Sequence, residues 1–335
     1  MRIATYNIEW FNGLFDDDGQ LLEDAEWSAR YKVTRAEQIT AIGIVLTALN
    51  ADAIMIIEAP DQSRHRSSVR ALEGFAAKMG LRTRRAVMGF ENDTQQEIAA
   101  LYDPDVLTLA HDPRGEATGA APRFDGVFRI DLDVDATEDV VQFSKPPLEL
   151  AARSASGTEF RMIGAHLKSK MPHGATTEKA AMRISIANRR KQLAQAIWLR
   201  RRVVDHLERG EPLIVMGDLN DGPGLDEYEH LFGRSSIEIV MGEGAQRLIE
   251  PHAHDALTRK LAPIHTTSRF YLSDTKRYMQ ALLDYIMVSP DLAARGPSWR
   301  IWHPFDDPDC WKVPDLCDAL ITASDHFPVT LDIDL

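Results

Sequence analysis

Short apolar segments that alternate with amphipathic segments are the feature that most constrains the fold. Residues 3–8, 51–58 and 213–220 are apolar or alternating and predict strands, most of them buried. Apolar residues recur at helical spacing in Arg35–Asn50, where Asn50 is expected to end the helix, and in Glu178–Arg209. Strands that alternate with helices throughout the chain predict a layered α/β fold.

The other predicted elements continue this alternation: a helix at Val69–Met79 and strands at 96–107, 124–134, 160–170, 282–289 and 326–335. No repeat, low-complexity tract or linker divides the chain, so we predict one domain over residues 1–335. A chain of this length buries roughly 75% of its unfolded surface and needs no disulfide. Cys310 and Cys317 are expected as reduced, inert thiols. The stretch 305–320 around them is expected as a surface loop, with a lid or rim as the alternative.

Charge and hydropathy bear on partners and location. No apolar run reaches the ~20 residues of a membrane span. The first ten residues lead into a strand without a secretory apolar segment, so a cytoplasmic protein with no membrane partner is predicted. The net charge of −13, from 38 basic and 51 acidic residues, disfavours non-specific attraction to nucleic acid. Local clusters of basic residues leave nucleic acid open as a partner, and the sequence does not define the oligomeric state.

The segment "GDLND", residues 217–221, shows how polar residues end these strands. It follows the apolar run 213–216, and alternation places Asp218 and Asn220 on one side and Leu219 on the other. Taken alone, the segment also reads as an ordinary turn, because Asp, Asn and Gly favour turns.

Polar side chains recur at the strand ends, namely Asn7, Glu9, Glu58, His166, Asp218, Asn220, Asp284, Asp325 and His326. Each has an ordinary explanation as a turn, cap or interior residue. These explanations would have to coincide at six strand ends, so we interpret the residues as one site.

A convergence of carboxylates has a physical cost. Two carboxylates 4 Å apart repel by about 4 kcal/mol at an effective dielectric constant near 20, so Glu58, Asp218, Asp284 and Asp325 would require shared protons or a cation. Oxygen donors without a nearby cysteine favour Mg²⁺ or Mn²⁺. Mg²⁺ keeps positions open for a substrate phosphate. The pattern therefore predicts phosphate chemistry.

The ordered segments "TYNIEW", "IIEAPD", "GAHLKSK", "GDLND", "LDYIMVS" and "SDHFPV" resemble the endonuclease/exonuclease/phosphatase, or DNase I-like, superfamily. The resemblance covers essentially the whole chain. It implies a four-layer αββα sandwich with two mixed β-sheets and a metal-dependent phosphoester hydrolase. The departure is Ile57, because the family usually has Gln before its metal-binding glutamate, and this concerns a hydrogen bond to that glutamate.

The resemblance also implies roles for the metal site. Glu58 matches the metal-binding glutamate, and Asn7 with Asp325 would help to hold the ion or its water. Glu9 lies where the abasic-site endonucleases carry an acidic residue.

For catalysis, the resemblance implies that Asp218 orients the attacking water and Asn220 contacts the scissile phosphate. His326 would be the catalytic histidine, oriented by Asp284. His166 would be a second histidine on the phosphate, supported by Glu97. Whether Asp218 or His326 is the general base stays open.

The substrate is the least defined part of the prediction. Lys168 and Lys170 follow His166, and Arg64 begins the basic run "RHRSSVR" after Glu58, so both would bring positive charge to the phosphate; a solvated helix face is the alternative for the second run. The aromatic and basic loops of the abasic-site endonucleases have no clear counterpart. The basic run 189–202 in the long helix is expected at the surface.

Three functions follow. The first is a phosphodiesterase or nuclease that acts by in-line attack of an activated water. The second is a phosphatase or phosphodiesterase of a small phosphorylated metabolite, and the third is a catalytically silent binding module. The sequence does not decide between endo and exo action or between one and two metal ions.

Overall fold

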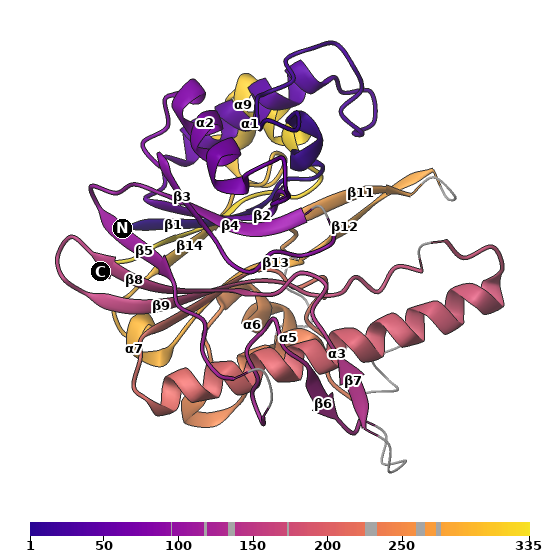
Figure 1. Ribbon diagram of the computed structural model, residues 1–335, viewed down its shortest axis with the longest axis vertical. Helices are drawn as coiled ribbons and strands as arrows, with labels where there is room; N and C mark the ends of the chain where they lie inside the picture. The colour runs from indigo at the N-terminus through magenta and orange to yellow at the C-terminus, as the bar shows by residue number, and fades with distance from the viewer. Residues whose placement is uncertain are drawn as a thin grey trace.

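Two β-sheets pack face to face between two layers of helices (Figure 1). The computed structural model describes residues 1–94, 96–116, 119–132, 138–172, 174–224, 233–258, 265–272 and 276–335. The predicted four-layer αββα sandwich with two mixed sheets is confirmed. Of the helices in these ranges, none is both long and apolar enough to cross a membrane.

The first sheet has six strands, in the order β14 (Ser298–Ile301), β15 (Val329–Asp332), β1 (Arg2–Asn7), β2 (Ala53–Pro60), β4 (Gln96–Tyr102) and β3 (Arg85–Met88). Only β1 and β2 are parallel. The helices on its outer side are η1 (Phe11–Leu14), α1 (Arg35–Leu49), α2 (Ser68–Met79), α8 (Pro308–Trp311) and α9 (Pro314–Ala323).

The second sheet has five strands, in the order β13 (Asp284–Val288), β10 (Leu213–Asp218), β9 (Glu159–His166), β8 (Leu148–Ser154) and β5 (Leu107–His111). Its outer side is covered by α3 (Glu178–Glu208), α5 (Ser236–Met241) and α6 (Pro251–Thr258). In the chain, η2 (Gly244–Gln246) follows α5, and α7 (Pro290–Ala293) follows β13. Two further pairs of strands are separate from the sheets: β6 (Phe128–Ile130) with β7 (Asp139–Val141), and β11 (Ser268–Leu272) with β12 (Arg277–Ala281).

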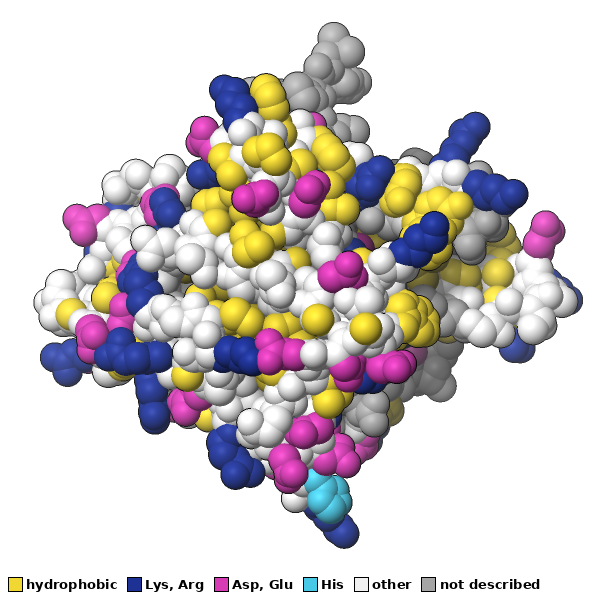
Figure 2. All heavy atoms as spheres, turned by 90° about the horizontal axis from the view of Figure 1, so that it is seen from above, with side chains coloured by type: hydrophobic (Ala, Val, Ile, Leu, Met, Phe, Trp, Pro, Cys, Tyr) yellow, Lys and Arg dark blue, Asp and Glu magenta, His cyan; other side chains and the backbone are white. Residues whose placement is uncertain are grey.

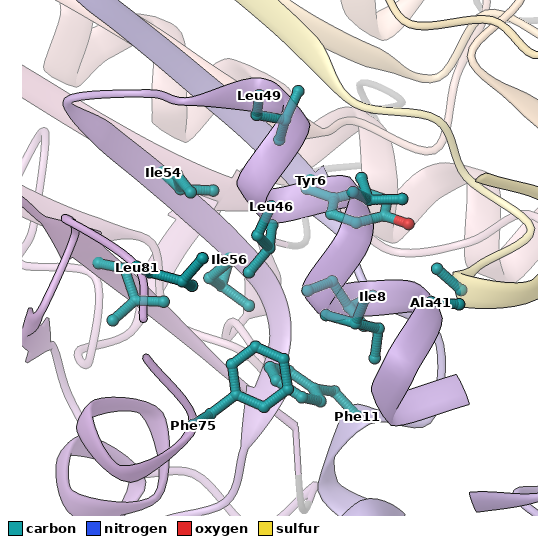
Figure 3. Close-up of a cluster of buried hydrophobic side chains, with 14 of the residues drawn as sticks. Tyr6, Ile8, Phe11, Ala41, Leu46, Leu49, Ile54, Ile56, Phe75 and Leu81 are labelled. Carbon is teal, nitrogen blue, oxygen red and sulfur yellow. The ribbon is translucent and has the colours of Figure 1, made fainter. Parts of the chain in front are cut away.

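Strand β2 shows why a continuous apolar run is needed in the centre of the sandwich. Ile54 and Ile56 point into the core under the helices (Figure 3), whereas Met55 and Ile57 point into the core between the sheets. A strand covered on both faces cannot alternate apolar with polar residues. The predicted helix α1 ends as expected, with Asn50 in the left-handed conformation at φ 43°.

The stretch 305–320 corrects one prediction, because it is not a surface loop. It contains α8 and most of α9. The apolar face of α9, with Leu316 and Leu320, packs into the core between the first sheet and its helices. Asp307 caps α8, and a proline stands in the first turn of each helix. These residues are typical of helix starts. Proline has no backbone N–H, but at the first helical position that N–H would have no partner within the helix. Cys310 is buried and neither cysteine is in a disulfide.

The basic run 189–202 corrects a second prediction, because two of its arginines are buried. Arg189 lies against Asp221, and Arg202 against Glu149. The predicted strand 124–134 is reduced to β6, and its residues 133 and 134 lie outside the described residues.

Candidate active site

Strand register brings the polar strand ends together at one edge of the sandwich. In the second sheet, Asp218 is paired with His166 on β9 and with Asp284 on β13. In the first sheet, Asn7 ends β1 beside Ile57 on β2, one residue before Glu58. The two edges face a common cavity of about 830 Å³.

The residues of the predicted site that line this cavity are Asn7, Glu9, Glu58, His166, Lys168, Asp218, Asn220, Asp325 and His326. Asp284 stands behind His326. Sequence positions more than 300 residues apart therefore meet in one site, as the pattern of strand ends predicts.

The carboxylate of Asp218 is the centre of the cavity's hydrogen bonds. Its Oδ2 accepts hydrogen bonds from Asn7 Nδ2 at 3.0 Å and from Asn220 Nδ2 at 3.2 Å. The same oxygen lies 3.5 Å from His166 Nε2 and 3.9 Å from His326 Nε2. Burial raises the pKa of Asp218 to about 7, although His326 opposes the shift. A carboxylate with such a pKa can both orient a water molecule and accept its proton.

His326 and Asp284 form a buried pair. His326 Nδ1 lies 2.7 Å from Asp284 Oδ2, which also accepts a hydrogen bond from Thr267 Oγ1 at 2.8 Å. Burial lowers the pKa of His326, but the carboxylates of Asp284 and Asp218 outweigh it and hold this pKa well above the usual range. Nδ1 therefore carries a proton towards Asp284, and Nε2 presents a second proton to the cavity.

Lys145 fixes the other histidine in the neutral form, and the sequence did not point to it. Its Nζ lies 3.2 Å from His166 Nδ1. An ammonium group can only donate, so Nδ1 accepts and the ring proton is on Nε2, which faces Asp218. Burial, followed by the charge of Lys145, holds the pKa of His166 well below its ordinary value. His166 is thus a neutral hydrogen-bond donor.

Glu58 is turned into the cavity by a bulge in β2. The register with β4 shifts between Ile57 and Ala59, and Glu58 has φ 64°, in the left-handed region. A bulge re-aims one side chain out of the strand's alternation. Gln96 on β4 donates a hydrogen bond from Nε2 to Glu58 Oε2 at 2.6 Å. The amide expected next to this glutamate is absent at Ile57 and comes instead from the neighbouring strand.

Glu9 and Asp325 form the outer acidic side of the cavity. Arg30 forms an ion pair with Glu9 and donates to the carbonyl oxygens of Ile321 and Thr322 at 3.0 and 2.9 Å. Burial, followed by the charge of Asp325, raises the pKa of Glu9 to about 7. Burial also raises the pKa of Asp325 and of Glu58. Burial and mutual repulsion therefore make the ionisation of these carboxylates unfavourable.

The donor set fits a divalent cation. Asn7 Oδ1 is buried and has no hydrogen-bond partner, and it stands among carboxylates whose pKa values are raised by burial. A hard cation would satisfy this oxygen and stabilise the ionised carboxylates. One ligand atom from each of Asp218, Asp284 and His326 also lies within 4.8 Å of the others, but the protons on both ring nitrogens of His326 leave it no lone pair for an ion.

Two predicted residues are placed elsewhere. Glu97 does not reach His166: its carboxylate accepts hydrogen bonds from the backbone N–H of Gln62 and from the Asn92 side chain, and Lys145 stands beside His166 instead. The exposed Arg64 is not part of the cavity lining, and Arg66 in the same run is buried against Asp61 and backbone carbonyls.

Gly217 explains why "GDLND" needs its glycine. It has φ 131°, and a Cβ atom there would lie 2.0 Å from the carbonyl oxygen of Ala165 on β9. Because β10 and β9 are this close, Asp218 and His166 stand side by side.

Lys170, also in the cavity wall, pairs with Asp221 at 2.8 Å.

The four-layer sandwich of two mixed sheets, with this cavity at the strand ends, is an α/β fold of the DNase I-like class. The chain belongs to the Endonuclease/Exonuclease/phosphatase family, whose sequence profile matches residues 4–326. Members of this family are phosphoester hydrolases, and family membership supports this activity for the chain. No curated protein matches the chain.

Solved structures share the fold at low sequence identity. The 3′-5′ exonuclease NExo from Neisseria meningitidis is 15% identical, with a TM-score of 0.51 and 100% of both chains covered. TDP2 from C. elegans is 13% identical, with a TM-score of 0.50 over 98% of this chain and 74% of that one. A family protein from Bacteroides thetaiotaomicron is 16% identical, with a TM-score of 0.50 over 100% and 98%. At these identities the likeness concerns the fold.

Proposed function

We propose that the protein is a divalent-metal-dependent phosphodiesterase or nuclease, which cleaves by in-line attack of an activated water. The observation that carries the proposal is the convergence of the His326–Asp284 pair, His166, Asp218, Asn7 and Glu58 around one cavity. Hydrogen-bond donors and ionisable oxygens therefore line one space that is open to a phosphate.

The metal would be held by Glu58 and Asn7, with Asp325 and Glu9 close by. Mg²⁺ or Mn²⁺ fits this oxygen-rich set. When bound, the ion supplies a Lewis acid that neutralises negative charge on the phosphate.

The chain's own groups divide the remaining work. Asp218 holds the attacking water through its carboxylate and takes its proton. Asn220 Nδ2, His166 Nε2 and His326 Nε2 donate hydrogen bonds to the phosphate oxygens. Donors fixed in advance around developing negative charge contribute the largest share of catalysis in many enzymes. Asp284 keeps His326 in the orientation that directs Nε2 into the cavity.

A turnover panel tests the proposal. The purified protein is incubated with Mg²⁺, Mn²⁺ or EDTA and with plasmid, abasic duplex, RNA, bis(p-nitrophenyl) phosphate and p-nitrophenyl phosphate. We expect metal-dependent cleavage of diesters that His326→Ala and Asp218→Asn each reduce by roughly 10²–10⁴-fold. The exposed His254 and Asp309 supply the matched controls His254→Ala and Asp309→Asn, which should retain wild-type rates.

Other outcomes separate the alternatives. Turnover of p-nitrophenyl phosphate alone would replace the diesterase with a phosphatase of small metabolites. No turnover of any substrate with either metal would leave a binding module.

A further inference from the structure

The hairpin β11–β12 stands away from both sheets and presents aromatic side chains to solvent. It is a separate two-stranded ribbon that projects from the sandwich (Figure 1). Tyr271 and Tyr278 are paired across the strands and are 49% and 52% exposed. A cluster of exposed aromatic rings on a projecting hairpin is typical of an interaction site.

The two faces of the hairpin carry different groups. Phe270 is paired with Met279, and these two side chains form an apolar wall of the active-site cavity, where the ring of Phe270 lies 5.4 Å from the ring of His326. The alternate positions on the same strands carry Arg269, Tyr271 and Tyr278. Tyr271 and Leu272, nearer the tip of the hairpin, also line the cavity, so the aromatic surface begins at the cavity rim.

The aromatic surface extends beyond the hairpin itself. Tyr31, which is 74% exposed, lies nearly parallel to Tyr271, with ring centroids 6.3 Å apart and an interplanar angle of 18°. Tyr271 contacts Tyr278 at 5.2 Å, and the guanidinium of Arg269 lies 3.5 Å from the centroid of Tyr278. These groups form a row of flat faces in space, which suits flat aromatic ligands better than aliphatic chains.

The charge of this surface is opposite to that of the whole protein. The chain has a net charge of −13. The described residues of the hairpin carry Arg269, Lys276 and Arg277 and no carboxylate, and Asp274 lies outside the described residues. Lys32 stands over the ring of Tyr31. Where the hairpin projects, the space-filling view shows hydrophobic side chains interspersed with Lys and Arg (Figure 2). A polyanion with aromatic groups matches this combination.

The base of the hairpin is attached to the catalytic loop. Arg269 N–H donates to the carbonyl oxygen of Asp325 at 2.7 Å, and Ser268 forms a β-bridge with His326. A ligand on the hairpin would therefore be positioned with respect to His326.

We propose that β11–β12 and Tyr31 form a stacking platform for the unpaired bases of a single-stranded nucleic acid whose scissile phosphodiester lies in the cavity. The proposal rests on the proposed function and specifies its substrate. Bases stack on Tyr271, Tyr278 and Tyr31, the nucleotide at the cleaved bond contacts Phe270, and Arg269 contributes a cation that stacks with them. Paired bases in a duplex have no free faces for such contacts, so the platform selects single strands.

Fluorescence anisotropy tests the platform without catalysis. The full chain in EDTA is titrated against a labelled oligothymidylate, an oligomer of equal length that has the phosphates but no bases, and a blunt duplex. We expect the oligothymidylate to bind at least roughly tenfold more tightly than either comparator, because each stacked base contributes separately. Equal affinity for the base-free oligomer would overturn the proposal.

Paired variants isolate stacking from structure. Tyr271→Ala combined with Tyr278→Ala should weaken binding of oligothymidylate by roughly 5- to 100-fold and leave binding of the base-free oligomer unchanged. Tyr271→Phe combined with Tyr278→Phe keeps the rings and should retain affinity. Trp311→Ala removes an exposed aromatic on α8 and serves as the control. Wild-type affinity in the double alanine variant would refute the platform.

The two proposals fail in different ways. Base-dependent binding with no hydrolysis of any phosphodiester would support the platform and overturn the hydrolase. Hydrolysis of diesters without base-dependent binding would support the hydrolase and overturn the platform. The same protein is also titrated with vesicles that contain phosphorylated lipid headgroups, and binding to these alone would assign the surface to a membrane and overturn the platform.

Discussion

Gln96 on β4 donates a hydrogen bond to the carboxylate of Glu58 on β2, over 2.6 Å. The neighbouring position on β2 is Ile57, whose side chain is buried between the sheets. The amide that orients the Glu58 carboxylate therefore comes from the adjacent strand, because Gln96 and Glu58 both line the cavity. The hydrogen bond to Glu58 thus comes from a different position in the chain than the resemblance to the family implies.

Removal of this amide should weaken metal binding. For Gln96→Leu we expect a loss of roughly 10- to 100-fold in affinity for Mn²⁺, as is usual when a group that orients a metal ligand is removed. Calorimetric titration with Mn²⁺ measures the change. Gln20→Leu, at an exposed position, is the control. Unchanged affinity in Gln96→Leu would show that Glu58 needs no such support.

The His326–Asp284 pair predicts a change in pH dependence. Asp284→Asn removes a charge that raises the pKa of His326, so this pKa should fall. If His326 donates as an imidazolium, the alkaline limb of the kcat profile moves to lower pH, and kcat decreases by roughly 10²–10⁴-fold. A shift of the acid limb instead would identify His326 as the general base. A kcat within tenfold of wild type would contradict the role of Asp284.

Metal-free protein should lose stability as the pH rises. Burial raises the pKa of Asp218 and of Glu9 to about 7. A carboxyl group with a raised folded-state pKa stabilises the fold below its unfolded pKa near 4, and this contribution disappears as the pH rises through 7. When the pH is raised from 5 to 8 in EDTA, the unfolding free energy of Asp218→Asn should fall by about 1–3 kcal/mol less than that of wild type.

Urea unfolding at the two pH values measures this difference, with Asp309→Asn as the control. Mg²⁺ at pH 8 should restore stability to wild type by binding the ionised carboxylates. Parallel pH dependence in wild type and Asp218→Asn would contradict the predicted linkage.

Gly217 should tolerate no side chain. In Gly217→Ala the new Cβ would meet the carbonyl oxygen of Ala165 at 2.0 Å, in a backbone conformation that L residues rarely adopt. We expect a loss of at least about 3 kcal/mol or failure to fold. Gly74→Ala, in the exposed part of α2 with no atom within 4 Å of the new Cβ, should instead stabilise by about 0.5–1 kcal/mol. Denaturant unfolding of the two variants compares them directly.

Residues that belong to regular strands were predictable from the sequence. Asn7, His166 and Asp218 end apolar strands, and a strand end has a defined place in a sheet. Hydrophobic periodicity therefore predicted the layers, and the polar residues at the strand ends predicted part of the cavity lining.

Residues whose position depends on irregular backbone or on tertiary pairing were not predictable. Lys145 stands in a segment outside the strands and reaches His166 only in the folded chain. Glu97 was expected beside His166, but the bulge in β2 shifts its register and places it against Asn92. The β11–β12 hairpin lacks a hydrophobic periodicity because no core covers it.

The cavity lies across the seam of the sandwich, with Asn7 from one sheet in contact with Asp218 from the other at 3.0 Å. Sliding either sheet by a single residue, about 3.3 Å, would separate them. The rate of turnover should therefore depend on how the two sheets are aligned. A substitution in the core between the sheets should abolish activity before it unfolds the protein.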